Sequence, residues 1–195
     1  MAFEKLRVEQ HEILDDPGPL STPLSCLRPL IAQLSLTHVY LGIAEGAFAE
    51  ARHYTLREAR PWHRSGVARS DQDPYILERY GEFWVGLEGV RALAARAADK
   101  LDAAWAKGDT LTAAERGDVA IAIAAARVAA TRVGLDICTR MFEVAGARAT
   151  HAGLALDRYW RNLRTQSLHD PVDYKVRELG AVSYTHLTLP TNREV

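Results

Sequence analysis

Apolar residues recur at steps of three and four along three long stretches of this 195-residue chain, which predicts three long helices. The stretches cover residues 24–60, 75–107 and 112–146. In the first, apolar residues occupy more than one face, which favours a place in the centre of a bundle or at a subunit interface. In the third, steps of four and three alternate, as is typical of a helix bundle. The pattern predicts an all-α, up-down helix bundle.

Residues that are typical of helix ends flank these stretches. Pro61 stops the first helix near Arg60, because proline disfavours a helical residue before it. Gly108 and Gly146 end the second and third helices. Thr112 is followed three residues later by a glutamate, and this spacing predicts a capping box at the start of the third helix.

The remaining segments are shorter. Residues 2–14 alternate apolar and polar side chains, which predicts a short strand or extended entry, and the proline-rich residues 15–23 predict a loop. A shorter helix is expected from about Leu154. The dipeptide Asp170-Pro171 predicts a further helix start, with the aspartate as N-cap and the proline at the first helical position.

Composition excludes several classes of function. The chain has 24 basic and 25 acidic residues, interspersed, which argues against a dedicated nucleic-acid or membrane-surface binder. No uncharged apolar run reaches the ~18 residues of a membrane span. Cys26 and Cys138 lie too far apart for a metal or redox motif and suit free thiols in a reducing cytoplasm. The histidines have no metal-ligand spacing, so we expect no metal site.

Three residues are candidates for chemistry, and each has a structural alternative. Arg148, after the glycine that ends the third helix, could present its guanidinium to a phosphate or carboxylate, or bind carbonyls at the helix end. The same two roles are open to Arg60. His169, just before a helix start, could exchange a proton with a ligand or be a half-buried structural histidine.

Read together, three segments resemble the C-terminal part of the acyl-CoA dehydrogenase superfamily. They are REARPW (57–62), FEVAGARAT (142–150) and LDRYWRNLRTQSLHDPVDYK (156–175), and the last is the most specific. The resemblance covers about residues 3–180 and is closest to the flavin-dependent monooxygenase branch of the superfamily. It implies the C-terminal helical domain of that fold, preceded by the last strand of a β domain.

The resemblance also implies roles for four residues. Arg60 is expected to reach the flavin of its own subunit, while Gly146 and Arg148 are expected to contact the flavin phosphate of the neighbouring subunit. His169 is expected near the reactive edge of the flavin, as the catalytic residue that supplies or takes protons. The implied cofactor is reduced FMN from a separate flavin reductase, with FAD as the alternative, and the implied substrate is a small sulfur-containing or aromatic molecule.

Two other functions stay open. Many family members that oxidise acyl-CoA thioesters with FAD carry Tyr-Glu-Gly where this chain has His169, Asp170 and Pro171. A short carboxylate occupied as an N-cap is a poor base for a distant carbon, so monooxygenase is the preferred interpretation and acyl-CoA dehydrogenase the alternative. A third possibility is an inactive piece that serves as a helical oligomerisation module.

The resemblance further predicts how the chain is divided. Residues 1–20 are expected to be a remnant of the preceding β domain and its linker, and residues 21–180 the C-terminal four-helix-bundle domain. Residues 181–195 do not match the family pattern and are expected to pack poorly. The implied assembly is a homo-oligomer, a dimer of dimers in the full-length protein, located in the cytoplasm.

Overall fold

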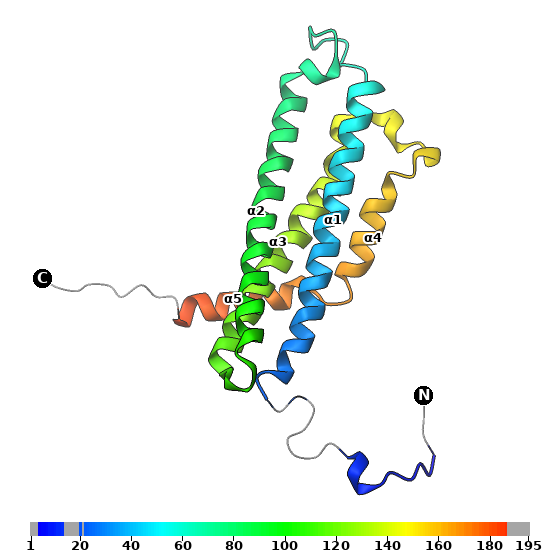
Figure 1. Cartoon of the computed structure of the whole chain (residues 1–195). Helices are drawn as coiled ribbons and strands as arrows, with labels where there is room; N and C mark the ends of the chain where they lie inside the picture. The colour runs from blue at the N-terminus through cyan, green and yellow to red at the C-terminus, as the bar shows by residue number, and fades with distance from the viewer. Residues whose placement is uncertain (1–3, 14–19, 21, 187–195) are drawn as a thin grey trace, which may run out of the picture.

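Three long helices and one short helix run up and down side by side, and a fifth helix crosses them near one end (Figure 1). The third helix is central and contacts all the others. The predicted all-α, up-down bundle is confirmed. The helices are α1 (Arg28–Arg57), α2 (Pro74–Ala106), α3 (Ala113–Ala145), α4 (Asp157–Ser167) and α5 (Val172–His186).

The structure, a computed structural model, describes residues 4–13, 20 and 22–186. Within 4–13, Gln10–Glu12 forms one 3-10 turn, and none of the described residues forms a strand. The predicted strand is therefore wrong over these residues. A strand needs a neighbour to pair its backbone N–H and C=O groups, and the described part of the chain supplies none. Of the predicted tail, residues 181–186 continue α5, and 187–195 lie outside the described residues.

The ends of the long helices follow the local sequence signals. Thr112 and Glu115 form the predicted capping box, in which each side chain accepts a hydrogen bond from the other residue's backbone N–H. Gly146 ends α3 with φ of 82°, a left-handed value that favours glycine, and its N–H donates to Phe142 O at 2.8 Å. The first helix stops at Arg57, slightly before the predicted end at Arg60, so the restriction that Pro61 places on Arg60 does not set the exact end.

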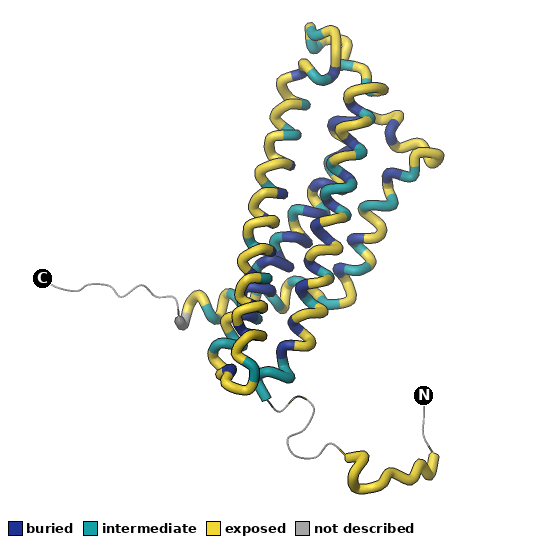
Figure 2. Tube along the Cα trace, in the orientation of Figure 1, coloured by how far each residue is buried: buried dark blue, intermediate teal, exposed yellow. Residues whose placement is uncertain are grey.

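The hydrophobic core has two halves, and buried positions face inward along the helices (Figure 2). One half includes Leu34 on α1 and Ala126 on α3, and the other includes Leu41 and Ala130 on the same helices. Three polar side chains of α1 and α3 are buried as well: Thr37, Arg127 and Thr131. Tyr40 is also buried and belongs to the half that includes Leu41 and Ala130.

Small residues let α4 lie close against the bundle. A Cβ at Gly134 of α3 would lie 3.0 Å from Cδ1 of Leu163, which is fully buried. A Cβ at Gly46 of α1 would lie 2.9 Å from Cε1 of Tyr159. This packing fixes α4 and therefore the turn that follows it.

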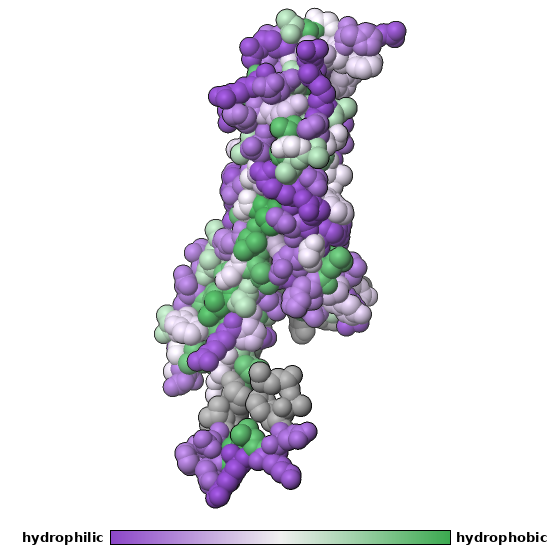
Figure 3. Space-filling model, turned by 90° about the vertical axis from the view of Figure 1, so that its right-hand side faces the viewer, coloured by the Kyte–Doolittle hydropathy of each residue, from purple (hydrophilic) through white to green (hydrophobic). Residues whose placement is uncertain are grey.

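The outer surface mixes hydrophobic and hydrophilic side chains. On the face shown in Figure 3, hydrophobic side chains gather mainly along the lower half of the bundle. On α2, Trp84, Val85 and Trp105 are each more than half exposed. No helix among the described residues is long and apolar enough to cross a membrane.

Candidate functional site

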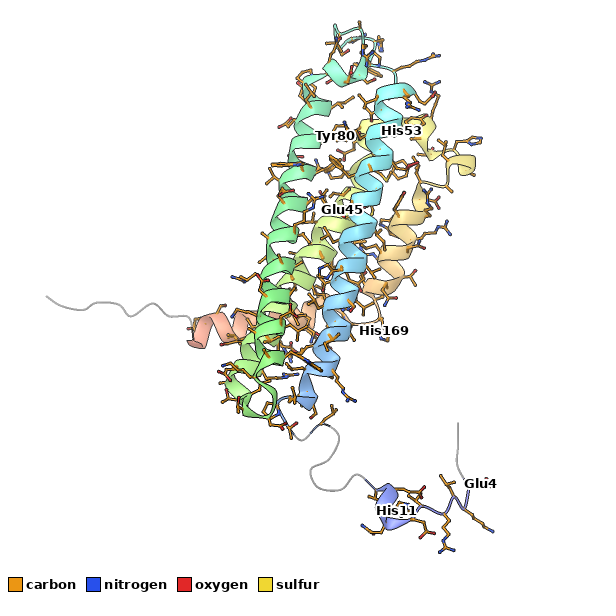
Figure 4. All side chains as sticks on the ribbon, viewed as in Figure 1. Glu4, His11, Glu45, His53, Tyr80 and His169 are labelled. Carbon is orange, nitrogen blue, oxygen red and sulfur yellow. The ribbon has the colours of Figure 1, made fainter. Side chains whose placement is uncertain are left out.

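The candidate residues occupy two separate places in the bundle. Arg60, Gly146 and Arg148 lie where α1 and α3 end, whereas His169 lies in the turn between α4 and α5. Figure 4 shows this separation, with His53 near the upper end of α1 and His169 below α4. The structure thus brings the three predicted cofactor-binding residues to one end of the chain's own bundle and leaves the predicted catalytic histidine away from them.

Arg148 lies on the edge of an open cleft at the upper end. The left-handed backbone of Gly146 turns the chain into the 3-10 turn Ala147–Thr150, which carries Arg148 toward α1. There Nη2 of Arg148 donates to the backbone oxygen of Glu58 at 3.2 Å, so the arginine does bind a carbonyl at a helix end, although that of α1 rather than α3. Its exposed side chain also lines a cleft of 780 Å³ together with Glu50 and other residues of α1 and the 3-10 turns.

Arg60 lines a neighbouring pocket of 280 Å³. Its exposed side chain makes no hydrogen bond or ion pair with any residue that the structure describes, so the alternative role at the helix end is not observed. In the same pocket Arg69 donates to both carboxylate oxygens of Asp71, at 2.9 and 2.7 Å, and these bonds lower the pKa of Asp71. Ser70 is buried there, and its hydroxyl has no partner among the described residues.

The Arg60 pocket can therefore bind an anion. Arg60 is a cation without a carboxylate partner among the described residues, and its exposed side chain lines the pocket. A planar guanidinium offers paired donors to phosphate or carboxylate oxygens. The cleft at Arg148 is more mixed, because the carboxylates of Glu50 and Glu58 line it as well.

His169 presents its side chain to solvent. The imidazole is exposed and forms no hydrogen bond with any described residue, so it is not the half-buried structural histidine of the alternative interpretation. Its backbone N–H donates to Gln166 O at 3.2 Å and closes the turn after α4. An imidazole in this position is free to exchange a proton with a bound molecule.

The predicted capping role of Asp170 is wrong. Its carboxylate accepts no backbone N–H among the described residues; instead Oδ2 lies 3.7 Å from Nη2 of Arg127. A cation buried in the core attracts a nearby carboxylate more strongly than a partly exposed helix start does, because solvent screens the interaction less there.

Sequence reasoning missed Arg127, whose side chain is 2% exposed in the middle of α3. Its guanidinium lies over the ring of Tyr40, 5.3 Å from the centroid, and Nη2 donates to the Tyr40 hydroxyl at 3.3 Å. That hydroxyl donates to Gln166 O at 3.0 Å. Burial raises the pKa of Tyr40, and the charge of Arg127 opposes the rise. The sequence contains one indication of this residue: Arg127 is the single charged residue between Val119 and Thr131, in an otherwise apolar stretch of the third helix.

Comparisons with known proteins agree with this fold. A family model described as the C-terminal domain of acyl-CoA dehydrogenase matches residues 34–174. The solved structure of methanesulfinate monooxygenase MsuC from Pseudomonas fluorescens is similar, with a TM-score of 0.88, 65% sequence identity, and coverage of 96% of this chain and 48% of that one. The FMN-bound structure of TdsC from Paenibacillus sp. A11-2 is similar with a TM-score of 0.76 and 38% identity, over 89% of this chain and 42% of that one.

Curated proteins give a concordant result. The chain is 68% identical over 178 residues to a "probable FMNH2-dependent monooxygenase SfnC" of Pseudomonas putida, which is 91% of this chain and 45% of the relative. It is 45% identical over 183 residues to a dibenzothiophene monooxygenase of Mycolicibacterium goodii, again 91% of this chain and 44% of the relative. The chain thus spans a little under half the length of these relatives.

Proposed function

Because this chain belongs to the acyl-CoA dehydrogenase family through its C-terminal domain, we propose that it is the C-terminal domain of a flavin-dependent monooxygenase acting on a small sulfur-containing molecule. The observation that carries the proposal is its 68% identity to a relative named as an FMNH2-dependent monooxygenase. The 65% identity to a methanesulfinate monooxygenase supports a sulfur-containing substrate.

The upper end of the bundle fits the phosphate of FMN. The unpaired Arg60 lines one pocket, and its guanidinium can donate to phosphate oxygens. We assign Arg60 to the FMN of its own subunit, and Gly146 and Arg148 to the FMN of a neighbouring subunit. This division suits the two separate pockets in which Arg60 and Arg148 lie. Bound reduced FMN supplies the electrons with which O₂ is activated.

His169 is the proposed catalytic residue of this chain. Its exposed imidazole can hold a proton at one ring nitrogen and give it to an oxygen atom of the reacting molecules. The neighbouring Asp170 is unsuited to remove a proton from an acyl-CoA, since its carboxylate faces the buried guanidinium of Arg127. The ion pair with Arg127 therefore argues against acyl-CoA dehydrogenation with Asp170 as the base.

The proposal includes partners. Large apolar side chains are exposed on α2 at Trp84, Val85 and Trp105, which supports a homo-oligomer, with a dimer of dimers as the proposed assembly. A separate flavin reductase would deliver reduced FMN. Both cysteines are free thiols, which supports a reducing compartment such as the cytoplasm. We also propose the division into residues 1–20, 21–180 and 181–195 described above.

To test the proposal, chemically reduced FMN, ¹⁸O₂ and methanesulfinate are added to the complete protein, of which this chain is the C-terminal domain. Oxygenation of the sulfur consumes one O₂ and one reduced FMN, adds one oxygen atom to the sulfinate, and releases the other as water. We expect a sulfonate that contains one ¹⁸O. If FAD bound to the protein is instead bleached anaerobically by an acyl-CoA and no oxygenated product forms, the protein is a dehydrogenase.

The third possibility, a helical oligomerisation module, is tested on the 195-residue chain. Titration with FMN and with FAD is expected to give weak binding, because the described chain contributes only part of the site. Light scattering is expected to show association through the exposed apolar side chains of α2. Oligomerisation in the complete protein without any turnover of reduced flavin would favour the module over the enzyme.

A further inference from the structure

A buried cation lies directly beneath the turn that carries His169. Arg127 is 2% exposed, and along α3 it lies after Ala126 of one half of the core and before Ala130 of the other. The carboxylate that faces it, Asp170, is partly exposed and lies 3.7 Å away, and Nη1 of Arg127 has no partner among the described residues. Burying a charge with such incomplete pairing costs stability, so stability does not explain an arginine here.

Arg127 is linked to the residues that precede and follow His169 in the turn between α4 and α5. On the side that precedes the histidine, Nη2 of Arg127 donates to the Tyr40 hydroxyl. A guanidinium can only donate, so the hydroxyl must direct its own proton elsewhere, and it does so to Gln166 O at 3.0 Å. That carbonyl also accepts the backbone N–H of His169 at 3.2 Å. On the other side Arg127 attracts the carboxylate of Asp170.

We propose that Arg127 is a positioning residue for His169, acting through Tyr40 and Gln166 on one side of the turn and through Asp170 on the other. The inference rests on the proposed function, in which His169 is the catalytic residue. Arg127 itself does not reach the imidazole: it fixes the backbone of the turn, while the side chain of His169 stays free for the reaction. The turn is thereby anchored to α1 and α3, which form the rigid centre of the bundle.

Hydrogen–deuterium exchange on the 195-residue chain tests the positioning without any flavin. We expect Arg127→Met to make the backbone amide of His169 exchange about tenfold faster, as when a hydrogen bond to a charged group is lost. Peptides from the core of α1 and α3 should keep their exchange rates, and the melting temperature should stay the same or rise. Arg127→Lys should restore part of the protection, because an ammonium can still donate to Tyr40 and attract Asp170.

Arg132→Met is the matched control, since Arg132 lies on the same helix with an exposed side chain and no interaction with the described residues. It should change neither the exchange of the turn nor the melting temperature. The inference is overturned if Arg127→Met leaves the His169 amide protected, or if it speeds exchange equally throughout the bundle, since either result would make Arg127 an ordinary core residue.

A second measurement separates this inference from the proposed function. In the complete protein, His169→Ala and Arg127→Met are compared for product formed per O₂ consumed at saturating reduced FMN. If both variants lower this ratio, His169 and its positioning by Arg127 are both supported. If only His169→Ala lowers it, the positioning role fails and the proposed function stands. If neither variant lowers it, the proposed role of His169 fails as well.

Discussion

The two cationic regions of this domain differ in their exposure. At the upper end, Arg60 and Arg148 extend into open pockets, and Arg60 has no charged partner among the described residues. Beneath the α4–α5 turn, Arg127 is buried and its interactions are directed at the protein itself. An exposed cation can be used by a ligand, whereas a buried one orders the residues around it. The first region is suited to binding a cofactor and the second to holding a reactive residue in place.

Helix α4 joins the two regions, and its docking should give the largest effect on stability. Leu163 is fully buried and packs against Gly134, so Leu163→Ala leaves a cavity that the glycine cannot fill. We expect a loss of about 2–5 kcal/mol in the free energy of unfolding, measured with urea. Leu168→Ala is the control, because Leu168 is 65% exposed and should change stability by less than about 0.5 kcal/mol. Equal effects of the two substitutions would contradict the docking of α4 on α3.

Tyr40→Phe should have the next largest effect on the free energy of unfolding. It should affect only the region of Arg127 and the α4–α5 turn. It removes the hydroxyl that accepts from Arg127 and donates to Gln166 O, and so leaves buried polar groups without a partner. We expect a loss of about 1–3 kcal/mol in urea denaturation.

FMN affinity in the complete protein should be unchanged by this substitution, since Arg60 and Arg148 are far from Tyr40. Tyr75→Phe serves as control, because Tyr75 is 74% exposed. A loss of FMN affinity in Tyr40→Phe would show that the two regions are coupled.

The capping box of Thr112 and Glu115, remote from both regions, should make the free energy of unfolding depend on pH. The ion pair with Lys107 and the cap at Thr112 lower the pKa of Glu115 from 4.5 to about 2. Because the folded-state pKa is the lower one, the stabilisation by Glu115 is fully present above pH 4.5 and is lost as the pH falls toward 2. The difference in free energy of unfolding between the wild type and Glu115→Gln should therefore shrink over this range. A difference that does not change with pH would contradict the lowered pKa.

The exposed arginines should have the smallest effect on stability. Arg60→Met and Arg148→Met are each expected to change the free energy of unfolding by less than about 0.5 kcal/mol. In the complete protein each should weaken FMN binding by about tenfold or more, as expected for a lost charge-assisted hydrogen bond, measured by fluorescence titration. Arg132→Met should leave FMN binding unchanged. If Arg60→Met or Arg148→Met instead lowers the free energy of unfolding by several kcal/mol and leaves FMN affinity unchanged, the assignment of these arginines to the cofactor is wrong.

The sequence predicted the bundle well because its signals are local. Periodic apolar residues, the Thr112 capping box and Gly146 act within one helix or at its end, and the structure agrees with each of them. Over residues 4–13, the described part of the predicted strand, the prediction was wrong because strands depend on a partner that a single segment cannot reveal. The exact end of α1 also differed, since Pro61 restricts only Arg60 and the helix ends earlier, at Arg57.

The candidate site was predictable only in part. Arg60, Arg148 and His169 have exposed side chains, and their predicted roles remain proposals. Arg127 was missed, and Asp170 was misassigned as an N-cap, for the same reason. Their pairing joins residues 43 positions apart through the packing of α3 against the α4–α5 turn, and no local pattern encodes that distance.

The central claim is that the arginines bind the cofactor whereas the turn carries the catalytic residue. The most direct test is the amount of oxygenated product formed per O₂ consumed by His169→Ala in the complete protein, at saturating reduced FMN. We expect product formation to fall by about 10²–10⁴-fold, the usual contribution of a general acid or base, while reduced FMN binds as in the wild type and O₂ is still consumed. A His169→Ala variant that keeps the wild-type ratio of product to O₂ would contradict the claim.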